Sequence, residues 1–220
     1  MVSANVQMLE QGTEQWLEAR RGVFTASVSS EIVSDPRKSP SLTKTALRLI
    51  RKKALEQITT EEIDPVFLSP AMQLGKKREP EAALVYSQRY EVQLIETGLT
   101  LWSESDEVGA SFDRVIKGWE GAIEIKCPGI MSHALYLEME TVDDLYRQAK
   151  GYYWQIVHQM LVGGFEYIDF VSYYPSFEIC DLKVLRVERT PKIEGHIRHL
   201  IHCLNLASEK KKEFIAMYQF

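Results

Sequence analysis

The stretch that decides the fold is Glu107–Pro128, which reads Glu-Val-Gly-Ala-Ser-Phe-Asp-Arg-Val-Ile-Lys-Gly-Trp-Glu-Gly-Ala-Ile-Glu-Ile-Lys-Cys-Pro. This pattern predicts two short strands joined by a turn at Lys117–Glu120. Asp113 falls near the end of the first strand, and Glu124 and Lys126 lie two residues apart on the second. Because side chains i and i+2 share one face of a strand, Glu124 and Lys126 point the same way among apolar neighbours. Charged groups are costly to bury without a partner or a function, so this hairpin is the first candidate site.

Length and composition narrow the class of protein. With 220 residues, 45% hydrophobic and 26% charged, we expect one globular domain spanning residues 1–220. Three cysteines without a CxxC spacing favour neither a disulfide framework nor a zinc ribbon. The first residues lack the basic and apolar regions of a signal peptide, and no stretch reaches the roughly 18 apolar residues of a membrane span. The sequence therefore predicts a cytoplasmic protein.

Periodicity along the chain predicts alternating helices and strands. Helices are expected at about 13–20 and 25–34, from Ser41 or Thr43 to about 55, and at 71–90, 132–140, 143–161 and from 191 onward. Strands are expected at 92–95 and 99–102, in the hairpin, and at 165–174 and 180–188. Residues 59–70 are expected to form a loop. No internal repeat or linker is present, so this order predicts an α/β fold with a small central sheet flanked by helices.

Positive charge is clustered although the net charge is −5. One group comprises Arg37, Lys38, Lys44, Arg48, Arg51, Lys52 and Lys53, and a second comprises Lys76, Lys77 and Arg78. A phosphate backbone responds to local positive surface rather than to whole-chain charge. The clusters are thus compatible with nucleic-acid binding, and a solvated helix face is the alternative.

The spacing of the hairpin's charged residues fits the D…(D/E)xK pattern of metal-dependent phosphodiesterases. Phosphodiester hydrolysis needs a hard cation to neutralise charge that develops on the phosphate oxygens. Mg²⁺ prefers oxygen ligands, and Asp113, Glu124 and the Ile125 carbonyl are suitable donors. Lys126 can stabilise or help to deprotonate the attacking water. The alternative is a buried ion pair between the carboxylates and Lys126.

Four ordered blocks of sequence specify a family. They are Trp16 followed by Arg20-Arg21-Gly22-Val23-Phe24-Thr25-Ala26-Ser27, then Leu74-Gly75-Lys76-Lys77-Arg78-Glu79, then Ser111-Phe112-Asp113 with Ile123-Glu124-Ile125-Lys126-Cys127-Pro128, and finally Tyr152-Tyr153-Trp154-Gln155. In these blocks the chain resembles the bacteriophage lambda exonuclease (YqaJ-like) recombination nucleases over nearly its whole length. The resemblance implies a restriction-endonuclease-like PD-(D/E)xK core, a central mixed β-sheet flanked by helices.

The resemblance also implies an activity and partners. The expected protein is a Mg²⁺-dependent 5′→3′ exonuclease on linear double-stranded DNA that uses two metal ions, for which Mn²⁺ can substitute. It would release 5′-mononucleotides and leave 3′ single-stranded tails for a single-strand annealing protein. A toroidal homotrimer encoded by a phage or prophage and acting in the bacterial cytoplasm is expected.

Site residues follow from the same motifs. The resemblance assigns Mg²⁺ to Asp113, Glu124 and the Ile125 carbonyl, places Glu79 at or near a second metal, and gives Lys126 the attacking water. Gln155 would orient the water or Lys126.

Contacts with DNA are implied as well. Arg20, Ser27 and Ser111 match positions that grip the 5′-phosphate, a role that suits a guanidinium and two hydroxyls. Arg37 matches a basic residue that tracks the DNA. Met72 takes the place of an apolar wedge that splits the end base pair.

The chain departs from the family pattern in two places. Phe112 stands where a proline is common, and Arg114 stands where a glycine is common, which puts the local strand geometry in doubt. In the last block a second glutamine of one relative falls on Val157, while Gln159 lies one turn beyond Gln155. We favour Gln155 as the site amide.

Two other functions compete with the exonuclease. One is a non-catalytic DNA-end-binding or interaction module in which the hairpin charges form a structural ion pair. The other is a sequence-specific endonuclease with the same core fold.

Histidine and tryptophan residues offer weaker candidates. His196, His199 and His202, with Cys203 beside them, could share a zinc ion, but a solvated or lightly packed helix face is favoured. His158 and the tryptophans Trp102, Trp119 and Trp154 are expected to be packed residues of the core.

Overall fold

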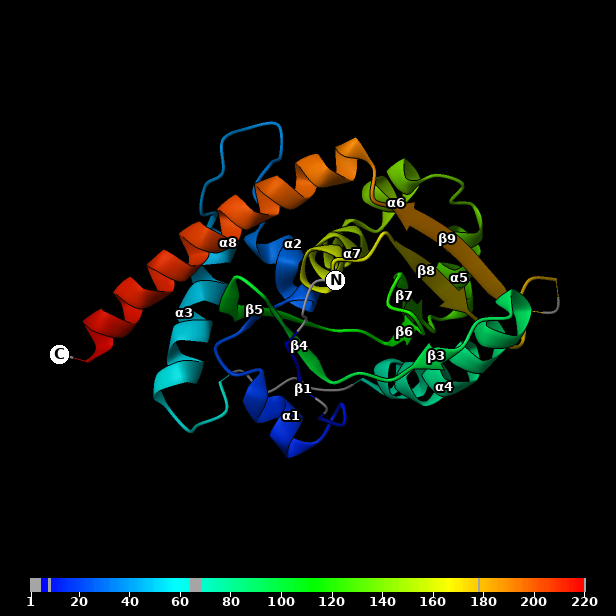
Figure 1. Ribbon diagram of the computed structural model, residues 1–220, viewed down its shortest axis with the longest axis horizontal. Helices are drawn as coiled ribbons and strands as arrows, with labels where there is room; N and C mark the ends of the chain where they lie inside the picture. The colour runs from blue at the N-terminus through cyan, green and yellow to red at the C-terminus, as the bar shows by residue number, and fades with distance from the viewer. Residues whose placement is uncertain (1–4, 8, 64–68, 178, 220) are drawn as a thin grey trace.

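The computed structural model describes residues 5–7, 9–63, 69–177 and 179–219 (Figure 1). The loop expected at residues 59–70 falls partly on 64–68, outside the described residues. In the described ranges no helix has the length and apolar character needed to cross a membrane. The three cysteines are free thiols.

The smaller of two sheets has four strands in the order β1-β4-β5-β2. These are β1 (Asn5–Gln7), β4 (Leu99–Trp102), β5 (Ser105–Ser111) and β2 (Phe24–Thr25). Strand β4 pairs antiparallel with β1 and β5, whereas β2 runs parallel to β5. Strands β1 and β2 were not expected from the sequence, because pieces of three and two residues are too short to show alternation.

The larger sheet is mixed and has the order β3-β6-β7-β8-β9. Its strands are β3 (Leu94–Ile95), β6 (Arg114–Ile116), β7 (Gly121–Lys126), β8 (Tyr167–Tyr173) and β9 (Leu182–Glu188). Strand β7 runs parallel to β8, and the other pairs are antiparallel. The central strand β7 therefore carries Glu124 and Lys126 in the middle of this sheet.

The quoted hairpin spans both sheets. The β6–β7 hairpin and its turn are confirmed, and Gly118 and Trp119 take the left-handed φ values of 111° and 66° there. The expected first strand, however, is two strands, because β5 ends in one sheet and β6 begins in the other. Phe112, at the crossing, is fully buried, with ring centroids 5.0 Å from Phe165 and 6.4 Å from Trp119. The unusual residue at this position is therefore a core residue, and Asp113 follows directly at the crossing point.

Helices cover both sheets. They are α1 (Glu14–Ala19), α2 (Ser29–Ile32), α3 (Lys44–Ile58), α4 (Pro70–Tyr90), α5 (Ile130–Leu137), α6 (Val142–Gln148), α7 (Lys150–Gly163) and α8 (Pro191–Tyr218), with a 3₁₀ turn at Ala26–Val28. Thr13 and Thr43 cap α1 and α3 through their side chains, so of the two starts that the sequence left open for α3, Ser41 and Thr43, the structure has Thr43. The helix expected at 143–161 is divided into α6 and α7 because Ala149 is non-helical, with φ −137° and ψ 51°.

Two helices position the candidate site. Helix α7 is almost entirely buried and contacts β4 and β5 of one sheet and β8 of the other (Figure 1). Helix α4 packs against β7 and β9. Ile123 and Ile125 share a hydrophobic cluster with α4, so the intervening Glu124 faces α7. Strand β7 thus directs its acidic residue, Glu124, towards the buried helix α7.

Candidate active site

Glu124 is the buried centre of the site. It is 1% exposed, and its carboxylate accepts hydrogen bonds from Gln155 Nε2 at 2.6 Å and Gln159 Nε2 at 2.5 Å. Lys126 Nζ forms an ion pair with Glu124 Oε1 at 2.5 Å. Hydrogen bonds to a charged carboxylate are among the stronger ones in proteins. These three donors fix the carboxylate in one orientation.

Asp113 lies beside Glu124 without a comparable set of donors. Its Oδ2 accepts a hydrogen bond from the Ile125 backbone amide at 2.7 Å. Burial and the negative charges of Glu124 and Glu79 raise the pKa of Asp113 well above its usual value, against the opposing effect of Lys126. The carboxyl group therefore lies where negative charge is not fully balanced.

Glu79 joins these groups from α4. Burial raises the pKa of its carboxyl group; nearby Lys126 lowers it and Glu124 raises it. Glu79 and Asp113 both line a cleft of about 410 Å³. The other lining residues are Leu9, Glu10, Gln11, Lys76, Pro80, Glu96, Thr97, Gly98 and Arg114.

The donor set can hold a magnesium ion. Within the described ranges, no three His, Cys, Asp or Glu side chains are grouped closely enough to enclose a metal ion. Mg²⁺ does not need such a cage, because it keeps several waters and is usually held by one or two carboxylates. Burial raises the pKa values of Asp113 and Glu79, and the charge of Glu124 adds to this effect; a bound cation would stabilise the charged forms of both carboxyl groups. Asp113, Glu124 and the Ile125 carbonyl therefore fit Mg²⁺.

Lys126 is a cation in this arrangement. Burial would lower the pKa of its ammonium group, but the charges of Glu124 and Asp113 raise the pKa above its ordinary value. The nitrogen lies 4.8 Å from the centre of the Tyr152 ring. Charge and position suit a hydrogen-bond donor directed at an anion.

Both candidate amides contact Glu124. Gln155 and Gln159 are four residues apart on α7, so they lie on one face of the helix. The sequence interpretation favoured Gln155 alone; the structure gives Gln159 an equivalent contact and buries it more deeply, at 1% exposed. Val157 points elsewhere and belongs to the hydrophobic core. The i, i+4 spacing was the signal that could have indicated a pair.

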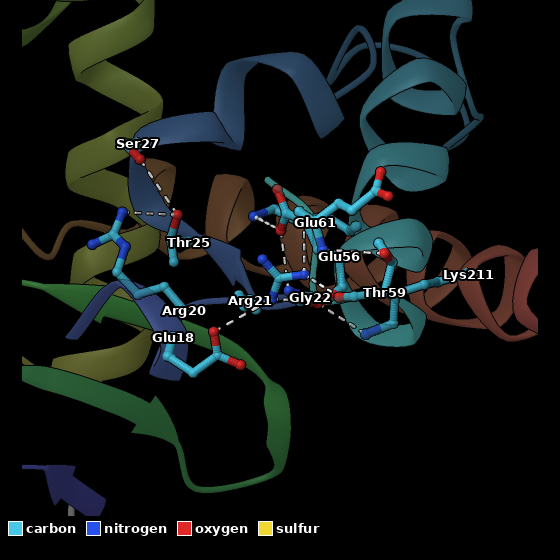
Figure 2. Close-up of polar contacts among 11 residues, drawn as sticks. Glu18, Arg20, Arg21, Gly22, Thr25, Ser27, Glu56, Thr59, Glu61 and Lys211 are labelled. Atoms are coloured by element: carbon cyan, nitrogen blue, oxygen red, sulfur yellow. Dashed lines mark hydrogen bonds and ion pairs between the residues drawn. The ribbon is translucent and has the colours of Figure 1, made fainter. Parts of the chain in front are cut away.

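A second polar cluster surrounds Arg20 (Figure 2). Its guanidinium donates to Ser111 Oγ at 3.2 Å and to Thr25 Oγ1 at 3.4 Å, and it lies 4.1 Å from the centre of the Trp16 ring. The hydroxyl of Ser27 is 3.3 Å from that of Thr25. The structure thus brings together Arg20, Ser27 and Ser111, and adds Thr25 and Trp16, which the sequence interpretation had not assigned.

The positive charge of Arg20 is placed mainly among neutral groups. Burial lowers the pKa of Arg20 to about 10, and the charge of Glu56 opposes this effect. Among the described residues, no carboxylate forms an ion pair with Arg20. A half-buried guanidinium that, among the described residues, contacts hydroxyl groups and an indole ring is suited to bind an anion.

A buried network supports the turn after Arg20 (Figure 2). Arg21 Nε donates to the Glu56 carbonyl at 3.1 Å, near the end of α3. Lys211, from α8, donates to the Gly22 carbonyl at 2.9 Å and pairs with Glu107 at 3.0 Å. Residues far apart in the sequence therefore hold the segment that carries the Arg20 cluster.

Two of the residues expected to contact DNA lie outside both clusters. Arg37 pairs with its neighbour Asp35 at 2.8 Å, and Met72 is half exposed in the first turn of α4. Neither lines the cleft. Lys53, counted in the basic cluster, is buried and paired with Glu56 at 2.7 Å, so it is not part of a positive surface.

The histidines have separate surroundings. His196 contacts Tyr153, His199 lies 3.4 Å from Ser34 Oγ, and His202 is exposed. His158 is fully buried and lies 2.7 Å from Ser29 Oγ. The solvated or lightly packed face favoured for the three helix histidines fits His202 but not His199, which is buried 3.6 Å from Cys203 Sγ. The expected packing of His158 agrees with its position.

Comparison with known structures establishes the fold. The alkaline exonuclease LHK-Exo from Laribacter hongkongensis superposes with a TM-score of 0.73 at 24% identity, covering 94% of this chain and 98% of that chain. Its complex with dAMP gives 0.72 at the same identity and coverage. A phage-related exonuclease from Haemophilus somnus 129PT gives 0.67 at 16% identity, covering 89% and 96%. The chain therefore shares the fold of these exonucleases, and the expected central mixed β-sheet flanked by helices is confirmed.

Sequence comparison establishes the family. The YqaJ-like viral recombinase domain matches residues 15–166, which contain all four motif blocks, and the chain belongs to this family. No curated protein sequence gives a significant match.

Proposed function

We propose that this protein is a Mg²⁺-dependent 5′→3′ exonuclease that degrades linear double-stranded DNA. The observation that carries the proposal is the buried group formed by Asp113, Glu124 and Lys126, of which Asp113 lines the cleft. Asp113 lies two residues after Ser111, a member of the Arg20 cluster. Membership of the YqaJ-like family and the fold shared with exonucleases support the same activity.

The residues grouped around Glu124 and Asp113 have complementary tasks. Asp113, Glu124 and the Ile125 carbonyl would hold one metal ion and Glu79 would lie near a second, and bound metal would stabilise the charge that develops at the phosphate. Lys126 donates a hydrogen bond to the attacking water or to a phosphate oxygen. Gln155 and Gln159 position the Glu124 carboxylate.

The Arg20 cluster is assigned to the 5′-phosphate. Ser111 belongs to the cluster and Asp113 to the metal site, and two residues span at most about 7 Å. This separation is comparable with one nucleotide of DNA backbone. A terminal phosphate held by Arg20 and Ser27 would therefore place the next phosphodiester at Asp113, which accounts for release of 5′-mononucleotides.

Assembly and partners complete the proposal. Degradation of one strand leaves a 3′ single strand, the substrate of an annealing protein. A homotrimeric ring around the duplex would keep a protein with net charge −5 on its substrate. Exposed apolar side chains on α5, including Met131 at 76% and Leu135 at 51%, provide surface for contacts between subunits or with that partner.

An Asp113→Asn variant separates the enzyme from a non-catalytic DNA-binding module. The change keeps the size of the side chain and removes the charge, so we expect digestion of linear duplex to fall by at least about 10³-fold while DNA binding persists. Asp181→Asn, at an exposed pair with Arg89, is the matched control. Undiminished digestion by Asp113→Asn would refute the assignment.

The endonuclease alternative predicts a different substrate range. An exonuclease that needs a DNA end digests linear duplex and leaves covalently closed circles intact. Cleavage of closed circles at defined positions would instead support a sequence-specific endonuclease.

A further inference from the structure

Arg114 is a cleft residue for which the proposed chemistry has no role. It opens β6 directly after Asp113 and lines the cleft together with Asp113 and Glu79. Its Nη1 donates to the Asp113 backbone carbonyl, and its Nη2 pairs with Glu96 Oε1 at 2.8 Å. The guanidinium therefore lies within the same cavity as two of the candidate metal-site carboxylates.

The two partners of the ion pair between Arg114 and Glu96 differ in their exposure to solvent. The side chain of Arg114 is 16% exposed, whereas that of Glu96 is 76% exposed. A solvated carboxylate contributes little to such a pair and can be replaced by another anion. The bond from Arg114 to the Asp113 carbonyl is local and can hold the guanidinium at the cleft during this exchange.

The cleft has more negative than positive side chains, so a phosphate that enters it needs a cation to bind to. Its lining includes four carboxylates, those of Glu10, Glu79, Glu96 and Asp113, and two cations, Lys76 and Arg114. A phosphate that enters the cleft therefore meets an excess of negative charge. Arginine can hold a phosphate with two parallel hydrogen bonds, which an ammonium group cannot match.

We propose that Arg114 binds a backbone phosphate of the DNA strand that occupies the cleft, exchanging Glu96 for that phosphate. The contact holds the strand against Asp113 and contributes one of the phosphate contacts of the complex. This role rests on the proposed nuclease function, because it assumes that the cleft takes a DNA strand.

The test compares Arg114→Gln, Arg114→Lys and Glu96→Gln with the parent protein. Digestion of 5′-phosphorylated linear duplex is measured for kcat and KM at several salt concentrations. Arg114→Gln is expected to raise KM about 10- to 100-fold and to reduce the slope of log(1/KM) against log[salt] by about 1, since one phosphate contact is lost. Arg114→Lys should restore the slope but only part of the KM, because the guanidinium fork is missing.

The variant at Glu96 distinguishes a DNA contact from a structural ion pair. Glu96→Gln removes the competing anion and should lower KM by up to about fivefold. A structural pair would instead make Arg114→Gln and Glu96→Gln equally defective, with an unchanged salt slope, and that result would overturn the role of Arg114. Arg89→Gln, at an exposed pair on the surface, controls for the loss of one positive charge. Melting temperatures of all variants verify folding.

Failure of the exonuclease proposal can be distinguished from failure of the role proposed for Arg114. A parent protein that digests no duplex would overturn the exonuclease proposal. Fluorescence anisotropy of the labelled duplex then measures the same salt slopes by binding, so that a slope equal in parent and Arg114→Gln still overturns the role of Arg114.

Discussion

Replacement of Arg20 by alanine should abolish the preference for 5′-phosphorylated ends. In the structure Arg20 donates two hydrogen bonds to hydroxyl groups, from Nη1 to Ser111 Oγ at 3.2 Å and from Nη2 to Thr25 Oγ1 at 3.4 Å. Both distances are at or beyond the upper end of the usual range. A terminal phosphate would replace these neutral hydroxyl acceptors by anionic oxygens, and hydrogen bonds to charged groups contribute about 1.5–3 kcal/mol each. Allowing for the hydroxyl contacts given up, the net gain is about 1.5–3 kcal/mol, equivalent to roughly 10- to 150-fold in kcat/KM.

The assay measures kcat/KM on two duplexes that differ only in a 5′-phosphate or a 5′-hydroxyl. The parent protein should prefer the phosphorylated end by about 10- to 150-fold, and Arg20→Ala should reduce this ratio to about 1. Arg20→Lys should fall between them, because it keeps the charge and loses the planar fork. Arg89→Ala, an exposed arginine paired with Asp181, should keep the parent ratio.

The alanine variant must also remain folded. Loss of the cation–π contact between Arg20 and Trp16 should lower the free energy of unfolding by about 1 kcal/mol, which a urea titration measures. A folded Arg20→Ala protein that keeps the full preference for phosphorylated ends would refute the assignment of the Arg20 cluster to the 5′-phosphate.

Three further predictions concern the residues around the site and the core. Gln159→Leu removes a donor to Glu124 and should raise the Mg²⁺ concentration for half-maximal digestion about 10- to 100-fold; an unchanged Mg²⁺ requirement would contradict its positioning role. Tyr86→Phe removes the 2.6 Å hydrogen bond to buried Asp169 and should lower the free energy of unfolding by about 1.5–3 kcal/mol in urea without affecting digestion. Burial lowers the pKa of His158 from 6.5 to about 3, so stability linked to this group is complete above pH 6.5 and is lost as the pH falls towards 3. His158→Gln should therefore reduce the pH dependence of unfolding between pH 4 and 6 by about one proton, and an unaltered slope would argue against a neutral, buried His158.

Local sequence patterns predicted the hairpin and the charged residues that it brings together. Alternation in β7 places Glu124 and Lys126 on one face, and the structure confirms that both lie at the same centre, opposite the face formed by Ile123 and Ile125. Capping threonines likewise marked helix starts, because the hydroxyl that satisfies a free amide lies within the same few residues.

Long-range relations were beyond such patterns. Alternation indicates which face of a strand is buried but not which sheet the strand joins, so the change of sheet at Phe112 was missed. Lys53 resembles any solvated helix lysine, and its burial depends on pairing with Glu56 beneath the turn at Gly22. The contact of Lys211 with Gly22 joins residues 189 positions apart, for which one sequence contains no local signal.

The family motifs carried information that periodicity lacked. They associated Arg20 with Ser27 and Ser111 from three separate elements, and the structure places these residues in one polar cluster. Thr25 and Trp16 complete that cluster through a hydroxyl and an indole ring, contacts that depend on side-chain direction rather than on residue spacing.

The most direct test of the proposed function is digestion of a linear duplex labelled separately at each strand end, with and without Mg²⁺. A 5′→3′ exonuclease should release the 5′ label as a mononucleotide at once, retain the 3′ label on a long single strand, and lose activity when EDTA removes the metal. Release of the 3′ label first, or equal digestion in EDTA, would contradict the proposal.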